Sequence, residues 1–419
     1  MIKPVLERVA DGAFRELPVT LAFWDGSSLP APAGESDATL RFRSPQAFNY
    51  MLSAPGELGL SRAWVAGELD VDGDIELVLG WRARFQDARL TAADKLRMAA
   101  TAVRVAGGAA LRRPPRLDAE AHQRGHMHSL VRDRVAISHH YDVSNAFYRQ
   151  VLGPTMVYSC AYFDSPDDTL EEAQERKLEL ICRKLALKPG DRLLDIGCGW
   201  GSLIMQAAAH HGVTALGVTL SEAQAQLARE RVREAGLEDR CEVRVCDYRE
   251  LREGKFDAVA SVGMYEHVGR GQLGTYVRTV KQLLKPGGAF LNHGITQLTP
   301  IAPHRRTFVN RFVFPDGELH PLTDVLNEMH AAGLEIRDVE SLREHYTLTL
   351  RLWVQNLEAG YEQAVGEVGE ARTRVWRLYM SGSAAAFAAG AISVFQTLAI
   401  NDGGEHRLPL NRARGGVVR

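Results

Sequence analysis

The sequence predicts an α/β protein: a parallel sheet covered by helices on both faces, preceded by a smaller α+β domain. From about Leu187 onward, apolar runs of strand length alternate with helical stretches. These runs are continuously apolar, which is typical of parallel strands buried on both faces. The chain has 419 residues, more than one ordinary core accommodates, so two domains are expected.

The composition is that of an ordinary globular protein, with 45% hydrophobic residues, 24% charged residues and a formal net charge of −2. The five cysteines are odd in number and follow no regular spacing, which favours free thiols in a reducing compartment. The sequence contains neither a long uninterrupted apolar stretch nor a signal-peptide core. We therefore expect a cytoplasmic protein whose membrane contact is peripheral.

The first domain is expected to span residues 1–115. "LPVTLAFWDGSS" and "ATLRFRS" read as strands, the first ending in a turn at Asp25 and Gly26. The stretch from "SPQAF" to "DVDGD" reads as helical with glycine-rich breaks. Glycines and prolines then mark a linker, and residues 116–419 form the second domain.

One segment of the first domain, Arg82–Arg116, carries nine Lys/Arg residues and two acids. A solvated face explains such a run, and so does contact with anionic lipid headgroups, because Leu, Met and Val are interleaved with the charges. Both interpretations stay open from the sequence.

The second domain reads as repeated βα units. Its five expected strands are "DRLLDIG", "VTALGVTL", "CEVRVCD", "FDAVASVG" and "AFLNHGIT". The helix "SEAQAQLARERVREAG" is expected to begin at an N-cap, Ser221, and the helix "TYVRTVKQLL" to be closed by Pro286-Gly287-Gly288. Ligands of such sheets bind at the carboxyl ends of the strands, near the point where the strand order reverses.

The first of these strands runs into "LLDIGCGWG", in which Gly197, Gly199 and Gly201 follow Asp195. A glycine-rich turn between strand and helix lets the backbone approach a ligand closely. The GxGxG spacing differs from the GxGxxG of dinucleotide-binding turns. It indicates a Rossmann-like S-adenosylmethionine-dependent methyltransferase domain, with a purely structural tight turn as the alternative.

The second strand ends in "GVTLSEAQ", without the acid that commonly binds ribose hydroxyls at this place. Thr219 and Gln224 offer a hydroxyl and an amide instead. Asp247 and Tyr248, after the third strand, suit the edge and the face of an adenine ring. These residues complete the expected cofactor site.

Several rarer motifs complete the pattern: "HHYDVSNAFYRQVLGPTMVYSCAYF", "LLDIGCGWGS", "GVTLSEAQ", "MYEHVG", "FLNHGIT", "FVFPDGEL" and "HYTLTLRLW". Together they resemble the family of cyclopropane-fatty-acyl-phospholipid synthases and mycolic acid cyclopropane synthases. The resemblance is dense from Ser138 to Trp353. The N-terminal domain resembles the extra domain of the phospholipid-modifying members, which favours phospholipid acyl chains as substrate.

The resemblance implies two sets of site residues. S-adenosylmethionine would be lined by Tyr158, Ser159, Gly197, Gly199, Trp200, Thr219, Gln224 and Tyr248. A bicarbonate ion would be held beside the substrate by Cys160, Glu266, His293, Ile295 and Tyr346.

The chemistry explains this choice of residues. Methyl transfer to an alkene leaves a carbocation, and a proton must then leave the added methyl group for the ring to close. Aromatic faces stabilise a cation without bonding to it; the candidates are Tyr141, Phe147, Tyr158, Tyr162, Phe163 and Tyr265. A thiolate beside the cation would be alkylated, so we interpret Cys160 as a neutral wall residue. His293 and Tyr346 would donate to bicarbonate, and Glu266 would accept from it.

We therefore expect an enzyme that forms cyclopropane rings on unsaturated phospholipids, with S-adenosylmethionine and bicarbonate. The N-terminal domain would help to dock it on the membrane and form a homodimer; no metal and no nucleic-acid partner is expected. A same-family enzyme that makes methylene- or methyl-branched chains, a small-molecule methyltransferase and a lipid-binding protein with a dead site remain alternatives. His139 and Asp142 are expected to shape a lid over the cofactor.

Overall fold

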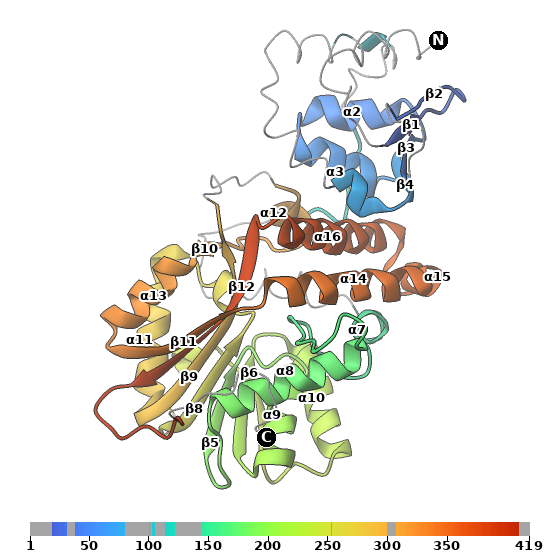
Figure 1. The fold of residues 1–419 in the computed structure, drawn as a ribbon. Helices are drawn as coiled ribbons and strands as arrows, with labels where there is room; N and C mark the ends of the chain where they lie inside the picture. Colours follow the sequence, from blue (N-terminus) through green and yellow to red (C-terminus); the bar gives the residue numbers. More distant parts are fainter. Residues whose placement is uncertain are drawn as a thin grey trace. The chain divides into compact units, whose positions relative to one another are not determined.

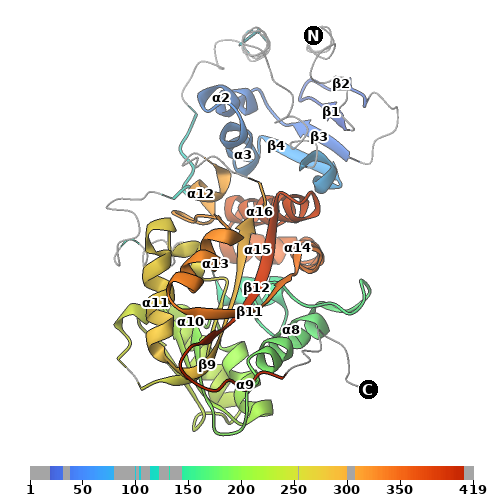
Figure 2. The same ribbon diagram turned by 60° about the vertical axis from the view of Figure 1, so that its left-hand side comes forward.

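The computed structural model describes residues 19–31, 38–79, 100, 103–104, 114–121, 132, 144–252, 254–299 and 307–409. The chain divides into two compact units (Figures 1 and 2). The first consists of Met1–His122, His304–Val313 and Tyr361–Ala389, and the second of Gln123–Pro303, Phe314–Gly360 and Gly390–Arg419. The first unit thus includes, besides the N-terminal segment, two segments from late in the sequence.

The first unit contains a four-stranded sheet in the order β2-β1-β3-β4. Its strands are β1 (Thr20–Ala22), β2 (Ser28–Leu29), β3 (Ala38–Phe42) and β4 (Leu69–Gly73). β1 and β2 are antiparallel around the predicted turn, in which Gly26 has a φ of 80° and Ser27 donates to the carboxylate of Asp25. β1 and β3 are parallel, and β3 and β4 are antiparallel.

The stretch predicted to be helical divides into α2 (Gln46–Ser53), α3 (Glu57–Val65) and the strand β4. The prediction was wrong for "LDVDG", where buried and exposed side chains begin to alternate and β4 pairs with β3. α12 (Phe308–Phe312), α15 (Tyr361–Val368) and α16 (Glu370–Ala388) complete this unit. Arg374 connects α16 to α3. The guanidinium of Arg374 lies 4.5 Å from the ring centre of Trp64 and donates to the backbone carbonyl of Trp64.

The second unit contains an eight-stranded sheet. The strands are β5 (Arg192–Ile196), β6 (Thr214–Thr219), β7 (Cys241–Val245), β8 (Phe256–Val262), β9 (Leu284–Gln297), β10 (His320–Pro321), β11 (Leu334–Ser341) and β12 (Ile392–Asn401). The order β11-β12-β9-β8-β5-β6-β7 is parallel from β9 to β7, with β10 added in parallel to β9. The parallel sheet is confirmed. Sequence analysis did not identify β11 and β12, which run antiparallel at one edge.

The helices of the second unit are α7 (Asn145–Leu152), α8 (Leu170–Lys184), α9 (Ser202–His211), α10 (Glu222–Glu234), α11 (Leu273–Leu283), α13 (Leu322–Ala331) and α14 (Arg343–Ala359). The N-cap of α10 is confirmed, because Ser221 accepts a hydrogen bond from the backbone N–H of Gln224 at 3.2 Å. The expected stop of α11 at Pro286-Gly287-Gly288 was wrong. The helix ends at Leu283, and these residues lie in β9, where pairing with β8 starts at Leu284.

Alternate residues of the parallel strands enter two cores. Leu193, Ala215 and Ala260 pack under α8, α9 and α10, whereas Leu194, Leu216 and Val259 pack under α11 and α13. Figures 1 and 2 show these helices on the two faces of the sheet. The strand order reverses at β5, which has β6 on one side and β8 on the other. The loops that follow these strands therefore enclose a crevice at their carboxyl ends.

In the described part of the chain, no helix combines the length and the hydrophobicity that crossing a bilayer requires.

Candidate active site

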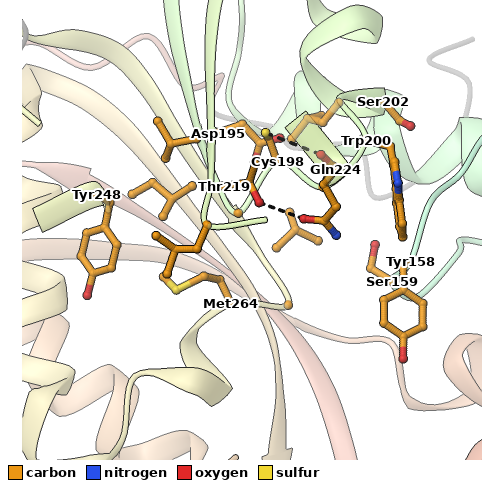
Figure 3. Close-up of a pocket in the computed structure, with 18 of the residues that line it drawn as sticks. Tyr158, Ser159, Asp195, Cys198, Trp200, Ser202, Thr219, Gln224, Tyr248 and Met264 are labelled. Carbon is orange, nitrogen blue, oxygen red and sulfur yellow. Dashed lines mark hydrogen bonds between the residues drawn. The ribbon is translucent and has the colours of Figure 1, made fainter. Parts of the chain in front are cut away.

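A pocket lies at the carboxyl ends of β5, β6, β7 and β8 (Figure 3). The glycine turn after β5 forms its floor. Gly197 has a φ of 82°, and a Cβ there would lie 3.2 Å from the side chain of Met264. The N–H groups of Gly197 and Cys198 both donate to the carbonyl of Val218, which ties the turn to β6. The turn is therefore held in a conformation that favours glycine and leaves room for a ligand.

Thr219 and Gln224 face each other across one side of the pocket (Figure 3). The hydroxyl of Thr219 donates to Oε1 of Gln224 at 2.8 Å, so the amide nitrogen of Gln224 is left to donate to a ligand. This pair lies at the end of β6, where the acid that commonly binds ribose hydroxyls is absent from this sequence. It can bind sugar hydroxyls without a negative charge.

Asp247 and Tyr248 follow β7 and line the pocket. The carboxylate of Asp247 pairs with Arg249, with Nη2 to Oδ2 at 2.6 Å, and caps the backbone N–H of that residue at 2.9 Å. The ring of Tyr248 packs edge-on against Tyr276 at 5.7 Å between ring centres. The structure thus positions a fixed aromatic side chain beside a neutralised carboxylate, which suits a flat heterocycle.

Tyr158, Ser159 and Trp200 lie at the other end of the pocket from Tyr248 (Figure 3). The indole N–H of Trp200 donates to Asn145 at 2.9 Å, and its ring packs against Tyr148 at 4.8 Å. Helix α7 therefore orients Trp200. All residues predicted to bind the cofactor line this pocket except Gly201, whose left-handed backbone forms the N-cap of α9.

Two buried charged side chains also line the pocket. Asp195 of β5 is 3% exposed, and its Oδ1 has no hydrogen-bond partner among the described residues. Burial raises the pKa of Asp195 to about 7, and the nearby charge of Lys177 opposes this rise. Lys177 of α8 is 2% exposed, and sequence analysis missed it. Its position in the buried stripe of α8, between Gln174 and Ile181, was the available signal.

Glu266 is the first of the residues that the resemblance implies for bicarbonate binding. It lies in a short 3-10 helix, η3 (Tyr265–His267), after β8, and its Oε1 accepts the backbone N–H of Ile295 at 2.8 Å. Its Oε2 is buried and has no hydrogen-bond partner in the described part of the chain. Burial raises the pKa of Glu266 to about 7, and the bond from Ile295 opposes the rise.

His293 is buried in β9, two residues before Ile295 on the same face of the strand. Gln396 of β12 donates its amide N–H to Nδ1 at 3.2 Å, so the proton of a neutral ring lies on Nε2. Nε2 is buried without a hydrogen-bond partner among the described residues. Burial and the charges of Lys177 and Lys184 hold the pKa of His293 well below its usual value, so the ring is neutral at pH 7.

Cys160 is fully buried, and its thiol donates to the carbonyl of Ala161 at 3.2 Å and lies 3.6 Å from the carbonyl of Leu342. Burial raises the pKa of Cys160 well above its usual value, so the group is a neutral thiol. A nucleophilic cysteine would need the opposite environment. The geometry agrees with the interpretation of Cys160 as a wall residue.

Tyr346 lies in the first turn of α14, where its N–H donates to the carbonyl of Leu342. The N–H of Leu342 in turn donates to the carbonyl of Val394 of β12, and Val394 pairs with Ile295 of β9. Leu342 and Val394 therefore connect Cys160 and Tyr346 to β9, which carries His293 and Ile295 and is bonded to Glu266. Segments separated by up to 186 positions in the sequence meet at this place.

The expected aromatic residues are spread around both groups. Tyr158 stacks on Trp353 at 5.3 Å, Tyr346 meets the same ring edge-on at 6.0 Å, and Phe147 packs against Tyr148. Tyr162 and Phe163 stack against His345, at 4.6 and 6.4 Å between ring centres, and Nδ1 of His345 accepts the N–H of Phe163. Sequence analysis missed Trp353 and His345, although both stand in the quoted motif "HYTLTLRLW".

Some predictions fall on residues that the structure does not describe. Tyr141, His139 and Asp142 lie outside the described residues, and so does most of Arg82–Arg116, of which only residues 100, 103–104 and 114–116 are described.

The model of the mycolic acid cyclopropane synthetase family matches residues 128–397. A probable fatty acid methyltransferase of Mycobacterium tuberculosis is 41% identical over 413 residues, covering 94% of each chain. A cyclopropane-fatty-acyl-phospholipid synthase of Escherichia coli is 37% identical over 260 residues, covering 62% of this chain and 66% of that protein.

A solved structure of mycolic acid cyclopropane synthase in complex with SAH and CTAB is similar over 64% of this chain and 98% of that one. The TM-score is 0.61 and the sequence identity 33%. Similarity at this level, together with the glycine turn, identifies the fold of the second unit as that of S-adenosylmethionine-dependent methyltransferases.

Proposed function

The chain belongs to the mycolic acid cyclopropane synthetase family, and from this premise we propose that it forms cyclopropane rings on unsaturated fatty acyl chains of membrane phospholipids. It is an S-adenosylmethionine-dependent methyltransferase. The observation that carries the proposal is that Glu266 Oε2 and His293 Nε2 are both buried polar atoms without hydrogen-bond partners in the described residues. One can accept and the other can donate, and the bond from the N–H of Ile295 to Glu266 joins the two segments that carry them.

The residues of the pocket fit S-adenosylmethionine. Tyr248 offers a face for the adenine, the Thr219–Gln224 pair offers groups for the ribose, and the unpartnered Oδ1 of Asp195 offers an acceptor for an ammonium group. The cofactor supplies an electrophilic methyl group. Because the acceptor alkene carries no proton that must leave first, no base is needed among the pocket residues for this transfer.

The second group fits a small anion that carries one hydroxyl. His293 donates through Nε2, Glu266 accepts through Oε2, and the backbone near Cys160 and the hydroxyl of Tyr346 add donors. Bicarbonate held there would supply a base at a fixed place. The two carboxylate oxygens of Glu266 have separate roles. Oε1 accepts the backbone N–H of Ile295, and Oε2 remains to accept a hydrogen bond from the anion.

The two electrons of the alkene form a bond to the methyl group while the S–CH3 bond breaks and leaves its electron pair on sulfur, giving S-adenosylhomocysteine; the other alkene carbon becomes a cation. A proton of the added methyl group would then pass to the bicarbonate held beside Glu266 and His293, and the electrons of that C–H bond close the ring onto the cationic carbon. Aromatic faces such as those of the half-buried Tyr158 and the buried Trp353 and Tyr265 stabilise the cation, each by about 0.5–2 kcal/mol. Cys160 is a neutral thiol and His293 has its lone-pair nitrogen, Nδ1, engaged by Gln396, so neither residue is a ready nucleophile that the cation would alkylate.

The test is incubation of the purified protein with S-adenosylmethionine and vesicles of an unsaturated phospholipid. Mass spectrometry should find acyl chains that gained one CH2 group and no longer react with a reagent specific for double bonds. Chains that gained CH2 and still react would support instead a methylene-forming enzyme, a candidate favoured by the 41% identity to a probable fatty acid methyltransferase. Methylation of a water-soluble acceptor alone would contradict both.

We also propose that the protein docks on membranes as a homodimer, with the basic segment Arg82–Arg116 contacting anionic headgroups. Binding to anionic vesicles should weaken as the salt concentration rises, because exposed charges are screened. Sedimentation equilibrium tests the dimer. Unchanged binding to uncharged vesicles at high salt would contradict the electrostatic contact.

A further inference from the structure

Lys177 is a buried lysine of the cofactor pocket that no motif explains. Its Nζ donates to the hydroxyl of Ser159 at 2.8 Å, and its side chain is 2% exposed. Among the described residues, no carboxylate forms an ion pair with Nζ. A serine hydroxyl and the charge of Asp195, which lies beyond ion-pair distance, compensate a buried ammonium group only in part. This arrangement is therefore best explained by a ligand that brings a negative charge.

The charges around Lys177 leave it cationic at neutral pH. Burial lowers the pKa of Lys177 to about 8, while Cys160, Asp195 and Cys182 oppose the decrease. Among the described residues, His293 also faces Lys177, and this ring is neutral. Lys177 and Asp195 thus place one positive and one negative side chain on the lining of the same pocket.

Their place in the pocket identifies which part of the cofactor they meet. In Figure 3 Tyr248 lies at one end, Tyr158 and Ser159 lie at the other, and Thr219 and Gln224 lie between them. With adenine at Tyr248 and the ribose at Thr219 and Gln224, the methionine arm extends toward Ser159. That arm ends in a carboxylate and an ammonium group, whose charges complement the two buried side chains.

We propose that Lys177 binds the carboxylate of the cofactor's methionine arm, with the hydroxyl of Ser159 held beside it by the same ammonium group. The proposal rests on the dependence on S-adenosylmethionine and not on the lipid product. If S-adenosylhomocysteine binds through Lys177 and no lipid is modified, the proposed function fails and the assignment of Lys177 stands.

The test is calorimetric binding of two ligands to the full chain. One is S-adenosylhomocysteine; the other is its decarboxylated analogue, which keeps the ammonium group and lacks the carboxylate. Wild-type protein should bind S-adenosylhomocysteine about 10- to 100-fold more tightly than the analogue, as expected for a hydrogen bond between charged groups. Equal affinity of the wild type for the two ligands would overturn the proposal without any variant.

The variant Lys177→Met keeps the volume and removes the charge. It should weaken S-adenosylhomocysteine binding by the same about 10- to 100-fold and leave the analogue within about threefold. Lys188→Met, at an exposed lysine outside the pocket, is the matched control and should change neither affinity. Equal losses for both ligands would show instead that Lys177 only tethers Ser159, and affinities of the variant equal to those of wild type for both ligands would show that it does neither.

Discussion

Glu266 and Ile295 form a hydrogen bond in which the backbone N–H of Ile295 donates to Oε1 of Glu266 at 2.8 Å. The bond connects the loop after β8 to the middle of the site on β9. It fixes one carboxylate oxygen and leaves the other buried and unpartnered among the described residues. Glu266 is therefore held in one orientation with a single oxygen for a ligand.

Glu266→Gln should abolish most product formation. The amide oxygen can still accept from Ile295, but the amide nitrogen donates where Oε2 accepted. We expect kcat to fall by about 10²- to 10⁴-fold, the range of a lost general acid–base partner. Calorimetry with S-adenosylhomocysteine should give an affinity within about threefold of wild type, because Glu266 does not line the cofactor pocket. A variant that lost cofactor affinity and kept its turnover would show that Glu266 has another role.

The pKa of Glu266 also predicts a dependence of stability on pH. Burial raises this pKa to about 7 in the folded state, whereas an unfolded glutamate titrates near 4.5. Between these values the folded chain binds the extra proton, so the free energy of unfolding should fall as the pH rises toward 7 and then level off. The raised pKa corresponds to roughly 3 kcal/mol.

The measurement is urea unfolding of the free protein from pH 5 to 8, for wild type and Glu266→Gln. Asp195, whose pKa is raised in the same way, and His293, whose pKa is lowered, titrate in both proteins. The difference between the two curves isolates Glu266. A difference that did not change with pH would exclude the raised pKa.

Tyr265 and Gly294 fix the strand behind this bond. The hydroxyl of Tyr265 donates to the carbonyl of Ile295 at 2.6 Å, and a Cβ on Gly294 would lie 1.8 Å from the ring of Tyr265. Gly294→Ala should lower the free energy of unfolding by about 1–3 kcal/mol or more through overpacking. Gly271→Ala, where a Cβ meets nothing within 4 Å, is the control in thermal melts. Equal melting temperatures of the two variants would refute the close packing.

Tyr265→Phe removes only the hydroxyl that orients the Ile295 peptide. We expect about 1 kcal/mol of lost stability, the net value of a typical buried hydrogen bond. kcat should fall with little change in cofactor affinity, because Tyr265 positions Ile295 and does not line the cofactor pocket. An unchanged kcat together with the expected loss of stability would reduce Tyr265 to a packing residue.

Cys160→Ser should keep substantial activity. The thiol is neutral and fully buried, and a serine hydroxyl can donate to the same carbonyl of Ala161. Iodoacetamide should not modify Cys160 in the folded protein at neutral pH, as peptide mass spectrometry would check, because the thiolate is the reactive species. Loss of all activity in the variant, with a covalent adduct trapped on wild-type Cys160, would restore the nucleophile.

The sequence by itself determined the local features. Continuous apolar runs predicted the five parallel strands, the glycine spacing predicted the cofactor turn, and Ser221 predicted the start of α10. These features depend on neighbours within a few residues, so pattern and propensity suffice for them. The strands β11, β12 and β4 were missed. β11 and β4 lie at the edges of their sheets and β12 lies between β11 and β9, and all three depend on antiparallel partners elsewhere in the chain.

Only the tertiary structure decided which chemical state each site residue has. Resemblance implied the list Cys160, Glu266, His293, Ile295 and Tyr346, but the neutral thiol, the neutral imidazole and the raised pKa of Glu266 follow from burial. Burial results from contacts with residues distant in sequence, such as the side chain of Gln396 and the backbone carbonyl of Leu342, which motifs do not encode. Lys177 shows the same limit: an ordinary lysine in a helical pattern becomes a buried cation because α8 packs its face against the pocket.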